Sequence, residues 1–353
     1  MKKLYVSVLL IFLLFAGCDV REPEIITLMT WNVHNLFDGK DDGFEYPDFR
    51  QQSGWSAEKY MGRINSISTA IRQIEPLPDI IVFQEIESHQ ILEDLADTMP
   101  RGYFWSHFAN NSGSAIGVGI LSRFEIAEFR THSISIDSIT IPRPILEVRI
   151  NSGFSDNSEF IVFACHWKSK IGGEDETEKN RRASVRVILR RIREIWEAEP
   201  DLGIVIAGDL NENYNEFFRR GSNMVTALLL DDPLCTLIAG AKQTDFIVIT
   251  DNKPPEPVYF PKETIVLFSP WINDLPADTG TYFYKNNWET LDQFLISHHF
   301  FGRKGLIYKT AFIGDFAPFI NINGVPVPYN PRTGYGLSDH LPLLIIFSLQ
   351  LQL

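Results

Sequence analysis

The sequence predicts a fold built from both α-helices and β-strands, and two patterns support this prediction. Short runs rich in Ile, Val and Phe recur along the 353 residues, and Gly, Pro, Asn or Asp bound them, as is typical of strands. Two longer segments instead repeat apolar residues every three or four positions, as amphipathic helices do. With 44% hydrophobic residues, the chain has enough apolar side chains for a large buried core.

Eight segments fit the strand pattern: 26–33, 79–85, 116–121, 145–150, 160–166, 203–209, 290–297 and 341–349. Several contain continuous apolar runs, as in 80–83 and 204–207, and strands of this kind are usually covered on both faces. We therefore expect sheets that have other layers packed against them.

Two segments fit the helix pattern. In the first, Ser56 is a plausible N-cap, and apolar residues recur at spacings of three and four until Pro76. In the second, Thr177 is the expected N-cap, and Pro200 follows the end. The Pro-rich stretch 251–280 is expected to be a long surface excursion. Because predicted strands precede and follow it, a single domain is favoured.

The N-terminus has the pattern of a cleaved export signal. Lys2 and Lys3 precede the apolar run 6–16, which is too short to span a bilayer comfortably. Residues 14–18, Leu-Phe-Ala-Gly-Cys, resemble a bacterial lipobox, in which the cysteine becomes lipidated. A plain secretory signal or an uncleaved anchor is the alternative. The expected division is a signal peptide at 1–17, a tether at 18–25 and the folded domain at 26–353.

These segments predict an exported lipoprotein of a bacterium, held at a membrane by lipidated Cys18 on the periplasmic side or at the cell surface. The chain is also expected to be a monomer. The net charge of −13 argues against long polyanions, because proteins bind them through Lys and Arg. Charge can still be local, since the stretch from Lys179 to Arg193 is basic without an acidic residue. We interpret that stretch as a solvated outer helix face. Cys165 and Cys235 could pair, although Cys165 lies in an apolar run that favours a buried thiol.

Polar side chains suited to binding metal ions or phosphate lie at the ends of apolar runs in several parts of the chain. They occur in Trp31-Asn32, Gln84-Glu85, 165–169, 208–211 and 336–343. A single Ser-Asp-His triplet means little, but this ordered set is hard to explain by chance. Together the clusters predict one metal-dependent site that hydrolyses a phosphate ester.

Such hydrolysis needs a cation for the phosphoryl oxygens, a base for the water, and donors that hold the phosphate. Glu85 is the best ligand candidate, because an unpaired carboxylate at the end of an apolar strand would be costly. Mg²⁺ prefers carboxylate oxygens and keeps several waters, so that one or two ligands suffice. Asn32 and Asp339 are expected to complete the metal site. Pairing with an arginine is the alternative role for Glu85.

The remaining polar residues receive catalytic roles. Asp209 would orient or deprotonate the attacking water, and Asn211, two positions later on the same side, would donate to a phosphate oxygen. His166 would stabilise charge or protonate the leaving oxygen. His340 would contact phosphate or water, with Asp292 fixing its tautomer.

Two basic residues close to these clusters in sequence, Lys168 and Arg181, are predicted to contact the phosphate. The other histidines lack partners at ligand spacing, and we expect them to be surface or hydrogen-bonded residues. Those histidines are His34, His89, His107, His132, His298 and His299.

These clusters, with Gly119–Arg123 and Leu291-Asp292, resemble the ordered motifs of the endonuclease/exonuclease/phosphatase superfamily from about residue 26 to residue 349. The resemblance implies an α+β fold of DNase I type, a four-layer α/β/β/α sandwich with the site between two sheets. It also implies dependence on Mg²⁺ or Mn²⁺, and His166 matches a histidine of the DNase and sphingomyelinase branches. One departure is His34, where a bacterial subgroup has Glu.

The sequence thus predicts a phosphodiesterase or nuclease. A sphingomyelinase-like phospholipase or an inositol-phosphate-type phosphatase is the alternative, so that the substrate is nucleic acid, a phospholipid or an inositol phosphate. A non-catalytic surface binding protein on the same fold is the alternative from another class. Loss of site residues would favour it, and every expected polar residue is present.

Overall fold

The computed structural model describes residues 25–100, 102–153, 159–240, 243–254, 264–303 and 305–350. The predicted signal peptide and Cys18, with nearly all of the predicted tether, lie outside the described residues. The boundaries given to these segments and to the domain therefore stay predictions. In the described part, no helix is long and apolar enough to cross a membrane.

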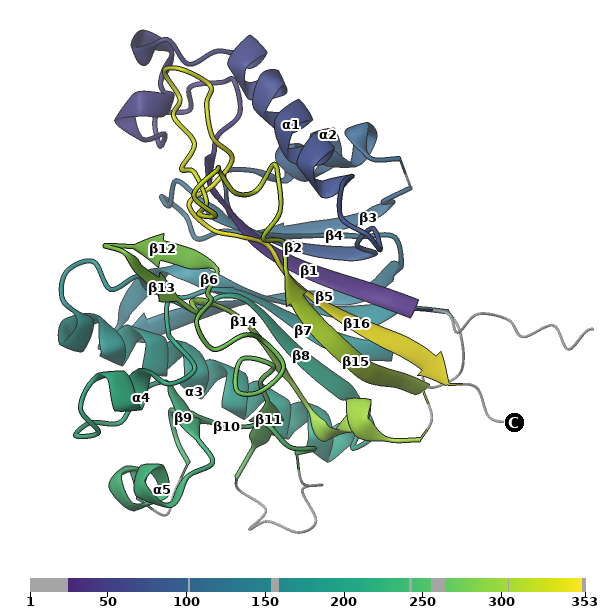
Figure 1. Cartoon of the computed structure of the whole chain (residues 1–353), viewed down its shortest axis with the longest axis vertical. Helices are drawn as coiled ribbons and strands as arrows, with labels where there is room; N and C mark the ends of the chain where they lie inside the picture. Colours follow the sequence, from purple (N-terminus) through teal and green to yellow (C-terminus); the bar gives the residue numbers. More distant parts are fainter. Residues whose placement is uncertain are drawn as a thin grey trace, which may run out of the picture.

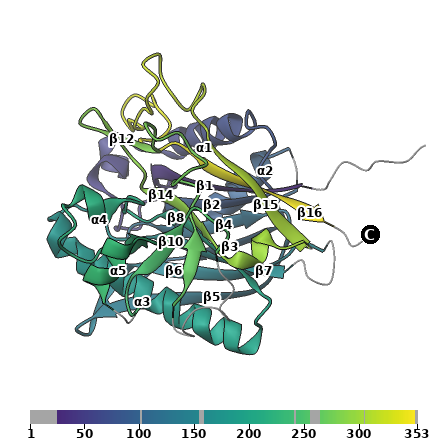
Figure 2. The same cartoon turned by 60° about the horizontal axis from the view of Figure 1, so that its bottom comes forward.

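The described chain forms two large sheets packed face to face, with helices on both outer sides (Figure 1). Helices α1 (Ala57–Ile71) and α2 (His89–Thr98) cover the first sheet, and α3 (Glu174–Ala198) covers the second, as the turned view in Figure 2 also shows. This arrangement confirms the expected four-layer α/β/β/α sandwich.

The first sheet has the strand order β15-β16-β1-β2-β4-β3. Its strands, in that order, are Gly305–Ile313, Leu343–Gln350, Ile25–Leu36, Ile80–Ile86, Gly117–Ser122 and Trp105–Ala109. The C-terminal strand β16 pairs antiparallel with β1, and β2 pairs parallel with β1 on the other side. The two ends of the domain therefore meet in the middle of one sheet.

The second sheet has the strand order β5-β6-β7-β8-β14-β11-β10-β9. Its strands, in that order, are Glu125–Ile136, Ile139–Asn151, Glu159–His166, Gly203–Asp209, Asp292–Ile296, Val266–Phe268, Ile247–Thr250 and Leu228–Leu230. A separate two-stranded hairpin consists of β12 (Tyr282–Tyr284) and β13 (Asn287–Glu289).

The remaining elements are short. They are the helices α4 (Glu216–Arg219) and α5 (Pro233–Ala239) and the 3₁₀ turns η1 (Pro47–Phe49), η2 (Gln51–Ser53) and η3 (His298–Phe301).

The alternation of side chains along the central strands explains why the layers form. On β7, Val162 and Ala164 belong to the core between the two sheets, whereas Ile161 and Phe163 belong to the core beneath α3. A strand with apolar residues on both faces must be covered on both sides, because exposed apolar area is unfavourable. The apolar runs from which we predicted covered strands do have packed layers on both faces, as β7 shows.

All eight predicted strands are present, with ends that differ by a few residues. The first predicted helix is confirmed, including the cap, because the Ser56 side chain accepts a hydrogen bond from the Lys59 amide. The predicted cap of the second helix is wrong. Helix α3 begins at Glu174, and the Thr177 hydroxyl instead donates to the Gly173 carbonyl at 2.7 Å from within the first turn.

The stretch 251–280 is also more ordered than expected. It contains the buried strand β11, which completes the second sheet between β14 and β10, and the buried side chain of Trp271. Cys165 and Cys235 are both buried, free thiols, so that they do not pair with each other.

Candidate active site

The two sheets bring most of the predicted strand ends together at one edge. Parallel pairing of β7 and β8 sets His166 beside Asp209, and antiparallel β14 sets Asp292 on the other side of Asp209. In the first sheet, parallel β1 and β2 bring Asn32 next to the end of the strand that carries Glu85. A hydrogen bond from Asn32 Nδ2 to Asp209 Oδ2, at 3.0 Å, joins the two sheets here.

Asp209 lies at the centre of the group. Its Oδ1 accepts a hydrogen bond from the backbone amide of Asn211 at 2.9 Å. The preceding Gly208 has a φ of 143°, and a Cβ atom there would lie 1.9 Å from the carbonyl oxygen of Cys165. Only glycine lets the two parallel strands approach this closely just before Asp209.

The surroundings raise the pKa of Asp209 to about 7. Burial is the main cause, because it disfavours the charged carboxylate. The positive charges of His340 and Arg143 oppose this effect, and the negative charge of Asp292 adds to it. Asp209 is therefore poised to exchange a proton near neutral pH.

The two histidines of the site have opposite protonation states. Burial, with the positive charges of Arg143, His340 and Lys168, holds the pKa of His166 well below its usual range, so that its ring is neutral. Burial also opposes charging of His340, but Asp292 outweighs this and raises the pKa of His340 to about 10. Environments that separate pKa values in this way divide acid and base roles between similar groups.

His340 is held from both sides. Its Nδ1 lies 2.7 Å from Asp292 Oδ2, so that Nε2 points toward Asp209 Oδ2 at 4.0 Å. The Ser338 hydroxyl accepts from the His340 amide and donates to the Asn32 carbonyl, and the Trp31 indole donates to the His340 carbonyl at 3.0 Å. The Trp31-Asn32 and Ser338-Asp339-His340 motifs are therefore joined directly by hydrogen bonds.

The carboxylate of Glu85, in β2, is held by hydrogen bonds from the neighbouring strand β1. Its Oε1 accepts from Asn32 Nδ2 at 3.2 Å, and its Oε2 accepts from the Asn35 amide at 2.9 Å. The Oδ1 atom of Asn32 meanwhile accepts from the His34 amide. Asn32 thus donates to two carboxylates, and its predicted role in a metal site stays a prediction.

The described residues contain no group of three or more His, Cys, Asp or Glu side chains that could hold a metal ion by themselves. Mg²⁺ and Mn²⁺ do not need such a cage, because they accept carboxylate oxygens and waters. Glu85 and Asp339 both line the pocket described below, and their side chains remain partly exposed to it. This oxygen donor set fits a hydrated divalent ion.

The site opens into a cavity of about 550 Å³. The predicted residues that line it are Glu85, His166, Asp209, Asn211, Asp339 and His340. Residues for which the sequence predicted no role also line it, among them Arg143 in β6, Lys170 after β7, Tyr282 in β12 and Glu289 in β13. Arg143 lies between Pro142 and Pro144 in the first half of β6, and this Pro-Arg-Pro sequence was the available signal.

Neither of the two predicted phosphate contacts is among the described residues that line this cavity. Arg181 is completely buried, with Nη2 2.6 Å from Glu178 and Nε 2.7 Å from Glu212. The prediction that Arg181 contacts phosphate is therefore corrected. Lys168 donates to Ser169 and to the Ile171 carbonyl, and it is not among the residues that line the cavity in the described chain.

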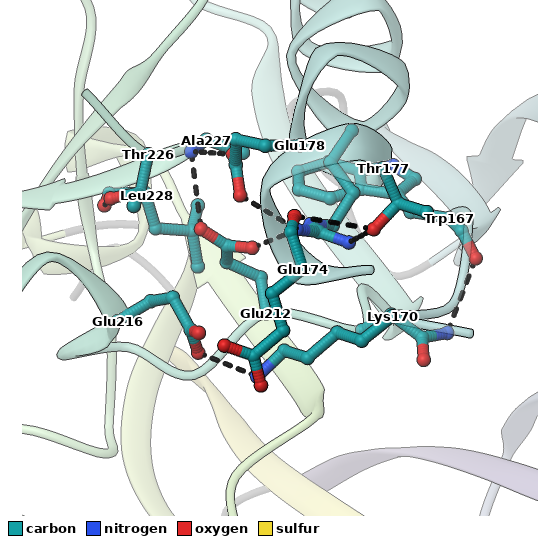
Figure 3. Close-up of polar contacts among 12 residues, drawn as sticks. Trp167, Lys170, Glu174, Thr177, Glu178, Glu212, Glu216, Thr226, Ala227 and Leu228 are labelled. Atoms are coloured by element: carbon teal, nitrogen blue, oxygen red, sulfur yellow. Dashed lines mark hydrogen bonds and ion pairs between the residues drawn. The ribbon is translucent and has the colours of Figure 1, made fainter. Parts of the chain in front are cut away.

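The carboxylates of Glu178 and Glu212, which pair with Arg181, belong to a larger group of charged side chains that includes Lys170 and Glu216 (Figure 3). Lys170 reaches from the loop after β7 to Glu216, at 2.8 Å, and to Glu289, at 3.3 Å. The negative charge of Glu216 acts on both Glu178 and Glu212. The basic stretch from Lys179 to Arg193 in α3 therefore has a partly structural role and is not wholly a surface for substrate.

Solved structures with this fold share little sequence with the chain. A Bacteroides thetaiotaomicron endonuclease/exonuclease/phosphatase family protein has 17% identity and a TM-score of 0.53, over 94% of this chain and 97% of the other. A mannosyl-6-phosphatase of the same organism has 16% identity and a TM-score of 0.52, over 92% and 100%. Truncated TDP2 of Caenorhabditis elegans has 14% identity and a TM-score of 0.54, over 92% and 97%.

No curated protein matches the sequence significantly. A family model described as the Endonuclease/Exonuclease/phosphatase family matches residues 27–223, which is more than half of the 353 residues. The match includes the strands that carry Asn32, Glu85, His166 and Asp209. The chain therefore belongs to the endonuclease/exonuclease/phosphatase family, whose members are hydrolases of phosphate esters.

Proposed function

We propose that this chain is a phosphoesterase that depends on Mg²⁺ or Mn²⁺ and hydrolyses its ester by attack of water on phosphorus. The observation that carries the proposal is the position of Asp209 between a neutral His166, 3.5 Å away, and a cationic His340, 4.0 Å away. A carboxylate with a pKa near 7 is well matched to removing a proton from water at neutral pH.

The other residues of the site hold charge and position. The His340 cation, fixed by Asp292, lies where it can bind a phosphoryl oxygen. The neutral ring of His166 can donate to an oxygen of the ester without adding net charge. Glu85 and Asp339 would hold the divalent ion, which when bound neutralises the negative charge of the phosphoryl group.

Arg143 takes the place of Arg181 as the proposed phosphate contact. Its guanidinium lines the cavity and donates to the Trp167 carbonyl. Among the described residues, no carboxylate lies within ion-pairing distance of it. An arginine without a carboxylate partner keeps donors available for a phosphate oxygen.

We infer that a small phosphate ester with a neutral, hydroxylated leaving group is the first candidate substrate. Glu174 and Glu289 also line the cavity, and Lys170 is neutralised by Glu216 and Glu289. A track of unpaired Lys and Arg, on which long polyanions depend, is therefore missing from the described wall. One protein of similar fold is a mannosyl-6-phosphatase, which agrees with this class.

Nucleic acid is the second candidate. Tyr282 and Tyr284 present two rings whose centroids are 6.2 Å apart and whose planes differ by 22°. Successive bases can stack on such a platform. The Tyr282–Tyr284 pair is thus one structural observation that supports nuclease activity, which was the first choice from the sequence.

Substrate panels would test both candidates. The full chain would be assayed with Mg²⁺, with Mn²⁺ and with EDTA on mannose 6-phosphate, inositol phosphates, plasmid and single-stranded DNA, and sphingomyelin vesicles. EDTA-sensitive hydrolysis of sugar or inositol monophosphates, with slower cleavage of DNA, would support the first candidate. Preferred cleavage of DNA would reverse the order. A folded chain that hydrolyses none of them would favour the binding-protein alternative.

We also propose that the chain is exported and anchored by lipidated Cys18, since residues 14–18 fit a lipobox. Mass spectrometry of the protein from its membrane fraction would test this. An acylated N-terminal peptide beginning at Cys18 is expected, and Cys18→Ala is expected to abolish it. A mature terminus elsewhere would contradict the proposal.

A further inference from the structure

Helix α1 carries an arginine that is buried beneath the predicted metal site. Arg63 is 2% exposed, although it lies in the middle of a helix on the outer side of the first sheet. Its guanidinium donates to three successive backbone carbonyls, those of Val33, His34 at 2.6 Å and Asn35 at 2.8 Å. Three consecutive carbonyls can converge on one side chain only where the backbone turns sharply.

The backbone does turn there. His34 and Asn35 have φ values of 54° and 59°, and both lie in the left-handed region that non-glycine residues rarely adopt. The register between β1 and β2 is interrupted between Asn32 and Leu36. Backbone of this kind costs free energy and persists only where surrounding contacts impose it.

This turn carries hydrogen bonds that fix the Glu85 carboxylate. The amide of Asn35 donates to Glu85 Oε2, and the amide of His34 holds the Asn32 side chain that donates to Glu85 Oε1. Glu85 itself has a φ of 64°, so that its own backbone is also left-handed. The orientation of the carboxylate therefore depends on the conformation of residues 33–35.

Arg63 is also unusual as a buried cation. Among the described residues it forms no ion pair with a carboxylate, and the ring of Tyr329 covers it at 3.8 Å from the guanidinium carbon. A buried charge is costly unless dipoles or counter-charges solvate it. Here the three carbonyls and the ring do so, and the charges of Glu85 and Asp339 lie close enough to stabilise it further.

We propose that Arg63 is a positioning residue that imposes the left-handed turn at residues 33–35, and thereby orients Glu85 for a divalent cation before the cation binds. This inference rests on the proposed function for its link to the metal. The geometric part concerns the chain alone. Tyr329 acts with Arg63, because it covers the guanidinium and its amide donates to His34 Nδ1 at 3.2 Å.

Two measurements on the full chain would test the proposal. Mn²⁺ binding would be measured by electron paramagnetic resonance, and hydrogen exchange would be followed for peptides that cover residues 31–38. The variants are Arg63→Met, Arg63→Lys and Tyr329→Leu. Arg72→Met is the matched control, because within the described chain the Arg72 side chain bonds to Ser68 and Thr69 of the same helix and to no part of the turn at 33–35.

In Arg63→Met, Mn²⁺ affinity is expected to fall by about tenfold or more, the range in which residues that orient metal ligands act. Exchange of the Asn35 amide is expected to quicken by about tenfold, while the rest of α1 keeps wild-type protection. Arg63→Lys should be intermediate, because it keeps the charge but loses the planar set of donors. The KM at saturating Mn²⁺ should stay near the wild-type value, which a general loss of structure would not allow.

Wild-type Mn²⁺ affinity and wild-type exchange in a folded Arg63→Met chain would overturn the proposal. If Arg63→Met does not fold, Arg63→Lys and Tyr329→Leu decide by the same criteria. If the wild-type chain itself binds no Mn²⁺, the proposed function fails. The exchange of residues 31–38 then still decides whether Arg63 imposes the turn.

Discussion

The floor and the outer wall of the cavity are built in different ways. The floor consists of buried side chains at strand ends, such as Asp209 and His166, which register and hydrogen bonds between the two sheets fix in place. The wall consists of the loop after β7 and the β12–β13 hairpin, where Tyr284 is 50% exposed. An isolated bridge pairs Tyr282 of the hairpin with His340, and Lys170 contacts Glu289 of the hairpin at 3.3 Å.

We infer from this difference that the floor carries out the chemistry and the wall selects the substrate. Groups of the floor cannot move without disturbing two sheets, so that their geometry and pKa values are set by the fold. Groups of the wall can change with little cost to the fold, because loops tolerate substitution. We therefore expect changes in the floor to lower kcat, and changes in the wall to alter KM and preference.

The largest effect among the supporting residues is expected at the His340–Asp292 pair. His340→Gln and Asp292→Asn should each lower kcat by about a hundredfold or more, because each removes the fixed cation. The double variant should lose little beyond the worse single variant, since the two residues act as a unit. Steady-state kinetics would check this, and multiplied losses would contradict a shared role.

Arg143 should have the next largest effect. Arg143→Met is expected to lower kcat/KM by about tenfold to a hundredfold, because it removes a charged donor from the cavity. Arg143→Lys should recover part of the loss, since it keeps the charge without the planar donors. Arg181→Met provides the contrast, because its buried partners predict a loss of thermal stability. Equal kinetic losses in folded Arg143→Met and Arg181→Met would undo the assignment.

The raised pKa of His340 predicts a dependence of stability on pH. The folded-state pKa is about 10 and the ordinary value is 6.5, so that the folded state holds its proton more tightly. The stabilisation is complete below about 6.5 and is lost as the pH rises through about 10. In EDTA, the melting temperature of the wild type should exceed that of His340→Gln by more at pH 6 than at pH 10. A constant difference would show that Asp292 does not hold the proton.

The smallest effect is expected in the wall. Tyr284→Ala should raise KM for a sugar phosphate by about threefold to tenfold, the range of one aromatic contact, and leave kcat nearly unchanged. Glycerol phosphate, which offers no ring, is the matched substrate control. A loss of kcat on both substrates would place Tyr284 in the floor instead.

Much of the fold followed from the sequence because its signals are local. Continuous apolar runs identified the buried strands, and Ser56 with Pro76 marked the limits around α1. Strands such as β10 and β11 were missed because they are three or four residues long and lie among loops. Their pairing depends on neighbours distant in sequence, which no local pattern reveals.

The absence of any local signal for contacts between distant residues also explains which site residues could be predicted from the sequence. Asn32, Glu85, Asp209 and His340 could be grouped because each lies beside an apolar run of the sequence. Arg181 was misplaced because its partner Glu212 lies 31 positions away in sequence, and only the fold brings the two together. Burial of a charge is decided by tertiary contacts of this kind.

The most direct test of the account is phosphate release by the full chain, measured for the wild type and Asp209→Asn, with Mg²⁺ or with EDTA. Asp245→Asn, which changes a carboxylate that pairs with Arg182 on α3, is the matched control. The account predicts metal-dependent release that falls by about a thousandfold in Asp209→Asn and persists in Asp245→Asn. Wild-type turnover in a folded Asp209→Asn chain would contradict the assignment of these strand ends as one hydrolytic site.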